Sequence, residues 1–218
     1  HQYIPRVEPA AGGGAGLAPF AIDGAAWGDF LCAVFDAWLA RDTRRVSVRL
    51  FDSILSVLVD NRRTACHMGR DCSHYMVVEY NGDVYPCDFF VEKDLRIGNI
   101  ERDAWAELLR APGHRAFGRK KQEWNAACDA CPWQRFCGGD CLKDRLLSRL
   151  NRPRELSVLC SGWKQFYAHA MPHMERLAAE IAGDRAAGAA SGTPQDPTNP
   201  RPGRNEPCPC GSGRKFKK

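Results

Sequence analysis

Eight of the eleven cysteines in this 218-residue chain follow one ordered pattern. The pattern reads Cys66, then Cys72-x9-Gly82-x4-Cys87, then Cys128-x2-Cys131-x5-Cys137-x3-Cys141, and finally Cys160. Eight thiolates are enough for two metal sites with four ligands each. The chain is therefore expected to fold so that segments far apart in the sequence bring their sulfur atoms together.

Disulfide bonds are a poor explanation for these cysteines. A chain of this length with 44% hydrophobic residues can bury an ordinary core, so it does not need the cross-links of small secreted domains. The sequence contains no recognisable signal peptide and no apolar run of membrane-spanning length. We therefore expect a cytoplasmic protein with no membrane partner, and in a reducing compartment clustered cysteines more often bind metal.

Zinc and iron-sulfur clusters are the two metal interpretations. The pair Cys128-x2-Cys131 alone would suit half of a zinc ribbon, and a zinc-only binding module remains an alternative. A zinc site normally repeats such a pair, whereas this run continues as x5-Cys-x3-Cys and is joined by distant single cysteines. Iron-sulfur proteins also divide the cysteines of one dense run between two clusters, so the spacing favours iron and sulfide.

At this point the pattern resembles a known module. It looks like the SPASM domain, the auxiliary-cluster domain of radical SAM enzymes that modify peptides. Within that group, the segments HMGRDCSHYMVVEYNGDVYPCDFFVEKDLRIGNI and HQYIPRVEP resemble the anaerobic sulfatase-maturating enzymes. The resemblance covers about residues 1 to 170.

The resemblance implies two auxiliary [4Fe-4S] clusters. Cluster one would be held by Cys66, Cys72, Cys87 and Cys141, and cluster two by Cys128, Cys131, Cys137 and Cys160. It also implies S-adenosylmethionine and a third [4Fe-4S] cluster in the full-length enzyme. Because none of the cysteines forms the Cys-x3-Cys-x2-Cys motif of that third cluster, and the chain begins at His1, we interpret it as the C-terminal part of a longer enzyme that is inactive alone.

Asp88 is the candidate catalytic residue. On chemistry alone, an aspartate after Cys87 is either a turn or cap residue or a general base. The resemblance implies the base: a 5′-deoxyadenosyl radical removes a Cβ hydrogen from a cysteine or serine of a sulfatase polypeptide, Asp88 takes the thiol or hydroxyl proton, and an auxiliary cluster accepts the electron. The product is Cα-formylglycine. Another SPASM enzyme, forming thioether or carbon-carbon crosslinks, would share the eight ligands without needing Asp88.

The elements around the cysteines can be read from periodicity. Residues 75–80, the Asn81-Gly82 pair and Val84-Tyr85 predict a β-hairpin that returns Cys87 to Cys72, with Gly82 in the positive-φ position of the turn. Apolar residues from Trp27 to Leu39 recur at helical spacing and predict a buried helix face. Further helices are expected over residues 103–110, after a Gly98-Asn99 turn, and from about Ser161 to Ile181.

The fold class expected is α/β with α+β character. Residues 2–7 read as a short strand and residues 46–61 as a helix or a strand turning into one. By resemblance, residues 1–62 are the last β/α elements of a radical SAM partial TIM barrel, in which Gln2 would be a substrate or cofactor contact near the active-site mouth. Residues 63–182 would be the auxiliary-cluster domain, of a β-hairpin plus helices, and the Ala/Gly/Pro-rich residues 183–202 a disordered linker.

A second motif closes the chain. Cys208-x-Cys210, followed by Gly-Ser-Gly and basic residues, resembles the SEC-C zinc-binding motif in residues 203–218. We expect these two thiolates to form only a partial zinc site, because tetrahedral zinc needs four ligands, and the intact motif to bind zinc. Basic tail residues supply most of the net charge of +5, so we expect no specific nucleic-acid binding by the body, and a ribosome or secretion chaperone as partner of the tail.

Three further features have ordinary explanations. The basic residues 119–121 read as a solvated face, because the run is short. His169 and His173 have the spacing of a metal pair, but Pro172 lies between them and a surface or core role is favoured. Cys32 has no cysteine at ligand spacing and reads as a small helix residue.

Overall fold

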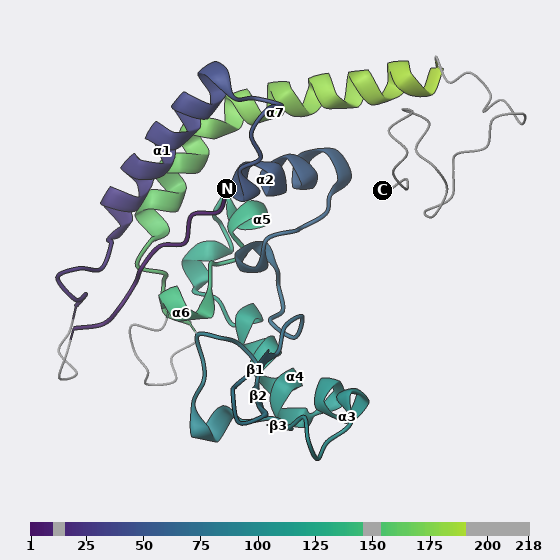
Figure 1. Ribbon diagram of the computed structural model, residues 1–218. Coiled ribbons are helices and arrows are strands. Elements are labelled where there is room, and N and C mark those ends of the chain that lie inside the picture. Colours follow the sequence, from purple (N-terminus) through teal and green to yellow (C-terminus); the bar gives the residue numbers. More distant parts are fainter. Residues whose placement is uncertain (11–15, 146–153, 191–218) are drawn as a thin grey trace, which may run out of the picture. The chain divides into compact units, whose positions relative to one another are not determined.

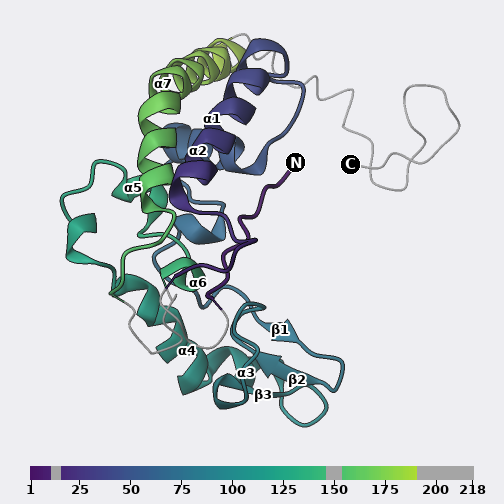
Figure 2. The same ribbon diagram turned by 90° about the vertical axis from the view of Figure 1, so that its left-hand side faces the viewer.

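The computed structural model describes residues 1–10, 16–145 and 154–190 (Figures 1 and 2). Contacts divide the chain into two units, His1–Ala178 and Ala179–Lys218. Everything below belongs to the first unit, except the C-terminal end of helix α7, which lies in the second. The described residues are mostly helical and contain one small antiparallel sheet.

The elements follow one another in a simple order. The helices are α1 (Gly24–Arg41), α2 (Arg49–Asp60), α3 (Trp105–Arg110), α4 (Pro112–Arg119), α5 (Gln134–Cys137), α6 (Leu142–Arg145) and α7 (Cys160–Ala190). Short 3₁₀ turns are η2 (Cys66–Met68), η3 (Lys93–Leu95), η4 (Lys120–Gln122) and η5 (Ala126–Cys128). The strands are β1 (Val77–Val78), β2 (Asp83–Tyr85) and β3 (Gly98–Asn99). No helix in the described ranges is both long and apolar enough to cross a membrane.

The hydrophobic core of the first unit is built by α1, α2 and the beginning of α7. Of the apolar residues that the α1 periodicity predicted to be buried, Phe30 is exposed, and Val34 and Leu39 are partly buried. The fully buried ones are Trp27, Leu31, Phe35 and Trp38. Phe35 packs edge-on against Phe51 of α2, with ring centroids 5.3 Å apart. Burial of such aromatic side chains, at about 25 cal/mol per Å² of apolar surface, is the main force that holds the three helices together.

Glycine allows α1 and α7 to pack main chain against main chain. The two helices run side by side (Figures 1 and 2). A Cβ atom added to Gly162 would lie 2.1 Å from the carbonyl oxygen of Gly24 and 2.8 Å from the nitrogen of Gly28. A Cβ on Gly28 would lie 2.9 Å from the Cα of Gly162. Any larger side chain at this crossing would push the helices apart.

The predicted hairpin is present and is extended by a third strand. β1 pairs with β2 in the register Val77↔Tyr85, and the turn is closed by a 2.9 Å bond from the Gly82 N–H to the Glu79 carbonyl. Gly82 has the positive φ expected, +80°. Gly98-Asn99, expected as a turn, is instead β3, which pairs with β2. The expected helix over residues 103–110 begins at Trp105, and Leu108 reaches the position where a Cβ of Gly98 would lie.

Two expectations about the ends of the body are wrong. Residues 2–7 form no strand; a bond from the Ile22 N–H to the Arg6 carbonyl and an isolated bridge, Pro9↔Leu17, are contacts too scattered for a ladder. Pro5 also lacks an N–H to donate. At the other end α7 continues to Ala190, so residues 183–190 are helical and not linker, because an alanine-rich segment extends an existing helix readily. The rest of the expected linker and the SEC-C segment lie outside the described residues.

Replacing Gly162 by alanine tests the helix crossing. Gly162→Ala is expected to lower the free energy of unfolding by about 1–3 kcal/mol or more, because its methyl group would overlap the α1 main chain. Urea denaturation followed by circular dichroism measures this. Gly183→Ala is the matched control in the same helix, since no atom lies within 4 Å of its added Cβ. It should change stability by about 1 kcal/mol or less, and an equal loss in both variants would contradict the crossing.

Candidate metal centre

The first set of cysteines comes from four different segments. Cys66 lies in η2, Cys72 in the loop before the hairpin, Cys87 after β2 and Cys141 before α6. The Cys72 N–H donates to the carbonyl of Gly118 at 3.2 Å, which fixes that loop against α4. We call Cys66, Cys72, Cys87 and Cys141 set one.

Side-chain interactions link the four thiols of set one. The thiols of Cys66 and Cys72 interact with each other, which lowers the pKa of Cys66 to about 7 and raises that of Cys72. The nearby charge of Cys141 adds to the rise at Cys72. Burial raises the pKa of Cys87 to about 12, and the charges of Asp88 and Cys66 add to this. Cys66 therefore interacts with both Cys72 and Cys87, the two cysteines that the hairpin was expected to bring together.

The second set is equally connected. Cys128 ends η5, Cys131 follows it, Cys137 ends α5 and Cys160 begins α7; these four are set two. Burial raises the pKa values of Cys128, Cys137 and Cys160, and charges of other members of the set add to each rise. Thiols within each set thus influence one another electrostatically, and the division of the eight cysteines into two ligand groups stays a prediction. Their role as cluster ligands is a proposal taken up below.

A single metal ion has no ready site in the described part of the chain. The nine cysteines there are all free thiols. Within the same residues no three His, Cys, Asp or Glu side chains are arranged to hold one ion. A tetrahedral zinc site would bring its sulfur atoms to about 3.8 Å from one another. Four-iron clusters are larger and separate their thiolates more widely.

Three charged side chains are buried between the two sets. Lys121 is 0% exposed, and Arg145 and Asp140 are each 1% exposed; together we call them the charge centre. Lys121 Nζ donates to the carbonyls of His67 and Asp140. Lys121 therefore joins the segment next to Cys66 to the segment next to Cys141. The expectation that residues 119–121 form a solvated face is wrong for Lys121, which folds inward from η4.

The x3 spacer between Cys137 and Cys141 provides the acceptors for Arg145. Gly138, Gly139 and Asp140 all have positive φ, at 58°, 72° and 66°. This unusual backbone turns their carbonyl oxygens toward the Arg145 guanidinium, which donates to them at 3.0, 2.6 and 3.0 Å. The spacer also packs closely, because a Cβ on Gly138 would lie 2.8 Å from the Met68 carbonyl oxygen.

The Asp140 carboxylate attaches the charge centre to α7. It accepts hydrogen bonds from the Ser157 hydroxyl at 2.5 Å and from the Trp163 indole N–H at 2.8 Å. Its other oxygen accepts from the N–H of Cys141 at 2.8 Å. A neighbouring carboxyl group, Asp144, is also buried, and burial followed by the charge of Asp140 raises its pKa to about 8.

Two buried polar atoms beside the cysteines find no partner among the described residues. These are the Tyr167 hydroxyl and the His67 Nε2. Burial, and then the charges of Cys137, Asp140 and Cys131, raise the pKa of Tyr167, which places its hydroxyl near set two. His67 directly follows Cys66 and stacks on Trp163, with ring centroids 5.1 Å apart. Buried polar groups without partners next to cysteines suit a cluster, whose potential depends on donors to its sulfur atoms.

Asp88 lies in an exposed turn directly after Cys87. A 3.0 Å bond from the Phe90 N–H to the Cys87 carbonyl closes this turn. The Cys87 thiol donates to the Asp88 carboxylate, with sulfur and oxygen 3.4 Å apart. The carboxylate is therefore open to solvent on one side and next to set one on the other.

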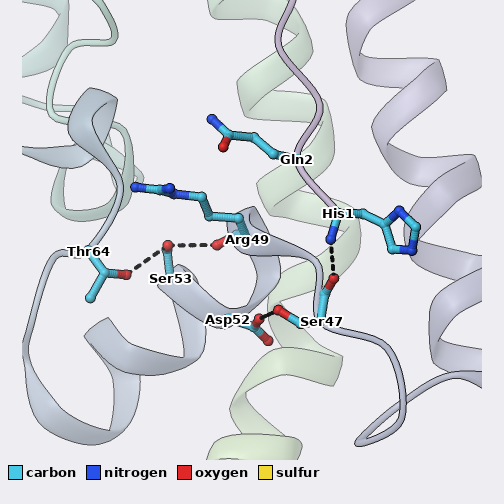
Figure 3. Close-up of a pocket in the computed structure, with 7 residues that line it drawn as sticks. All are labelled: His1, Gln2, Ser47, Arg49, Asp52, Ser53 and Thr64. Carbon is cyan, nitrogen blue, oxygen red and sulfur yellow. Dashed lines mark hydrogen bonds between the residues drawn. The ribbon is translucent and has the colours of Figure 1, made fainter.

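Gln2 lines a cleft of about 480 Å³ with His1, Ser47, Arg49, Asp52, Ser53 and Thr64 (Figure 3). The cleft wall is tied together by hydrogen bonds from the His1 amino group to the Ser47 carbonyl and from Thr64 to the Ser53 hydroxyl. Figure 3 shows the side chains of Gln2 and Arg49 extending in the same direction, from the N-terminal segment and from α2. The volume is within the range of small-molecule sites.

Comparisons with known families identify two modules. Residues 66–132 match the SPASM model, described as an iron-sulfur cluster-binding domain. Residues 204–218 match the SEC-C motif and lie outside the described residues.

Comparisons with individual proteins agree with the first module and extend beyond it. The chain is 33% identical over 171 residues to the serine-type anaerobic sulfatase-maturating enzyme of Bacteroides thetaiotaomicron, covering 78% of this chain and 41% of that enzyme. It is 33% identical over 154 residues to the cysteine-type enzyme of Clostridium perfringens, covering 70% and 41%. The chain is homologous to the anaerobic sulfatase-maturating enzymes.

A solved structure agrees with this homology. Native anSMEcpe with bound AdoMet and Kp18Cys peptide superposes with a TM-score of 0.73 at 30% identity, over 83% of this chain and 50% of that chain. This chain therefore spans about 41% of its curated sulfatase-maturating relatives and half of the solved one.

The charge centre was missed by the sequence analysis. The one sequence signal for the charge centre was the Gly138-Gly139-Asp140 spacer, because two adjacent glycines favour positive φ. The partners Lys121 and Arg145 are basic residues in ordinary polar segments, and nothing local indicates that they are buried. By contrast, Cys32 packs beside the α1 core as expected, and His169 and His173 contact Asp36 and Arg176.

Neutralising Asp140 tests the importance of the charge centre for folding. In the metal-free chain, Asp140→Asn is expected to lower the free energy of unfolding by about 3 kcal/mol, because it removes a buried negative charge that acts on both Lys121 and Arg145. Asp129→Asn is the matched control, since Asp129 accepts a similar 2.7 Å bond from the Trp124 indole but is exposed. That variant should lose about 1 kcal/mol or less. Urea denaturation decides, and similar losses would refute the special role of Asp140.

Proposed function

We propose that this chain is the auxiliary-cluster portion of a radical SAM oxidoreductase that converts a cysteine or serine of a sulfatase to Cα-formylglycine. The observation that carries the proposal is the homology of the chain to sulfatase-maturating enzymes, together with the match of residues 66–132 to an iron-sulfur cluster-binding domain. Both serine-type and cysteine-type relatives match at 33% identity, so the proposal includes both substrates.

The eight cysteines are proposed to hold two [4Fe-4S] clusters. Set one would hold one cluster and set two the other. When bound, such clusters supply centres that take up single electrons at potentials set by the surrounding protein. The chain's own contribution is to keep four thiols of each set together, to supply the buried cations nearby, and to surround them with aromatic side chains such as Trp163 and Tyr167, which limit access of water.

Asp88 is proposed to be the general base. Oxidation of serine to the aldehyde, or of cysteine to a thioaldehyde that water hydrolyses with release of hydrogen sulfide, removes the proton of the hydroxyl or thiol. That proton needs an acceptor. Asp88 is exposed to an incoming peptide. In the metal-free state its carboxylate accepts from the Cys87 thiol. A cysteine that binds metal has lost its proton, so loading of set one removes this donor and leaves the carboxylate available to the substrate.

Gln2 is proposed to contact the substrate or S-adenosylmethionine in the full-length enzyme. Its carboxamide lines a cleft whose other walls carry Arg49 and Asp52. These groups can donate and accept hydrogen bonds to a polar ligand. S-adenosylmethionine and the third cluster belong to the proposal for the whole enzyme, of which this chain spans about half or less.

Metal analysis tests the cofactor. After anaerobic reconstitution, the chain should contain iron and sulfide for two four-iron clusters, with paramagnetic resonance signals on reduction. Cys87→Ala and Cys131→Ala should each remove about half of the iron, since each takes one ligand from a different set. Cys32→Ala, outside both sets, should keep the full content. Stoichiometric zinc without sulfide would refute the iron-sulfur assignment.

Substitution of Asp88 tests the reaction. In the full-length enzyme, Asp88→Asn should lower the rate of formylglycine formation on a sulfatase peptide by about 100-fold or more, because the amide does not accept the proton. Iron content and resonance signals should not change. Asp94→Asn is the control and should retain the rate, because Asp94 is another exposed aspartate, six residues later in η3. Retained activity in Asp88→Asn would favour a different SPASM reaction.

A further inference from the structure

Two buried cations lie between the cysteine sets without carboxylate partners of their own. In residues 1–10, 16–145 and 154–190, Lys121 and Arg145 donate to main-chain carbonyl oxygens, and neither forms an ion pair with a carboxylate. Carbonyl groups satisfy the hydrogen bonds of a cation but carry no net charge. A buried cation is costly unless nearby negative charge compensates it. The buried carboxylate of Asp140 acts on both cations electrostatically but forms an ion pair with neither.

Both cations act on thiols of both sets. The positive charge of Lys121 favours the thiolate forms of Cys66, Cys72 and Cys141 in set one and of Cys137 in set two. Arg145 interacts electrostatically with Cys72 of set one and with Cys128 and Cys137 of set two. Once metal binding has deprotonated the cysteines, thiolates of both sets supply the negative charge that the two cations lack.

Cluster binding would supply that negative charge. A four-iron cluster held by four thiolates is an anion, and reduction adds a further electron. A buried positive charge stabilises the more negative, reduced form over the oxidised form, because the low dielectric of the interior weakens the interaction little. Exposed cations near the sets, such as Lys164, are screened by water and salt.

We propose that Lys121 and Arg145 form a shared cationic centre that compensates the charge of the clusters in both cysteine sets and raises the reduction potentials of both. This inference rests on the proposed function, since it requires the two clusters. Its distinctive consequence is that one substitution shifts two potentials in the same direction, because Lys121 and Arg145 both bind the Asp140 carbonyl in the spacer between Cys137 of set two and Cys141 of set one.

Redox titration of the anaerobically reconstituted 218-residue chain tests the inference. Lys121→Gln removes the charge but keeps a donor for the His67 carbonyl. It should lower the equilibrium constant for one-electron reduction of each cluster at least tenfold, which corresponds to a fall of about 59 mV in each potential. Arg145→Lys keeps the charge with fewer donors and should leave both potentials near the wild-type values. Lys164→Gln, an equal charge change at an exposed position that acts on Cys128 and Cys160, should shift the potential of set two much less.

Thermal unfolding adds a second readout. Wild-type chain should gain stability on cluster loading, and Lys121→Gln should gain less, because the cluster no longer compensates a buried cation. Unchanged potentials in Lys121→Gln, or an equal gain in stability, would overturn the inference. If Lys121→Gln does not fold, Arg145→Lys decides: wild-type potentials support the charge role, whereas lowered potentials or failure to load would assign the role to hydrogen-bond geometry and overturn it.

The outcomes separate this inference from the proposed function. A wild-type chain that takes up no iron and sulfide would contradict the proposed function itself. A wild-type chain that loads two clusters, together with Lys121→Gln potentials equal to those of wild type, would contradict only the charge compensation.

Discussion

The buried charge centre is the constraint on which the rest of the first unit depends. Lys121, Asp140 and Arg145 belong to η4, the spacer and α6, and their bonds reach the His67 carbonyl and the Trp163 indole. Four short segments, η2, η4, the spacer and α6, are thus held together with the start of α7 by hydrogen bonds from and to these charged side chains. Short elements such as α5 and α6 cannot be stable by helix propensity alone, because isolated helices of this length are marginal in water. The cysteines at their ends are positioned by this network.

The arrangement separates two tasks along the chain. Set one is made of loop and hairpin residues, and Cys87 shares an exposed turn with Asp88. Set two is completed by Cys160, the first residue of a helix that packs into the aromatic core. In the proposed enzyme, a proton acceptor therefore lies beside set one, while set two is attached to the aromatic core. This division assigns the proposed proton transfer to the surroundings of set one.

Sequence patterns predicted those parts of the structure that depend on local rules. The α1 periodicity identified Trp27, Leu31, Phe35 and Trp38 as core, and the turn chemistry of Gly82 located the hairpin. The burial of Lys121 could not be predicted, because it depends on carbonyl groups contributed from residues 67 and 140. The strand expected over residues 2–7 failed for a similar reason, since a strand exists only with a neighbour to pair with. Prediction from the sequence was therefore most accurate where neighbouring residues in the sequence determine the conformation.

The glycine crossing of α1 and α7 has a kinetic consequence. Cys160 stands two positions before Gly162, so set two is complete only when α7 has docked on α1. The two helices meet through residues such as Asp29 and Gln165, which are 136 positions apart. Closing so long a loop is slow compared with forming a hairpin or a helix. We therefore expect the hairpin cysteines to be in place early during folding and the eighth thiol to arrive last, so that the protein becomes competent to take up its full complement of iron only at the end of folding.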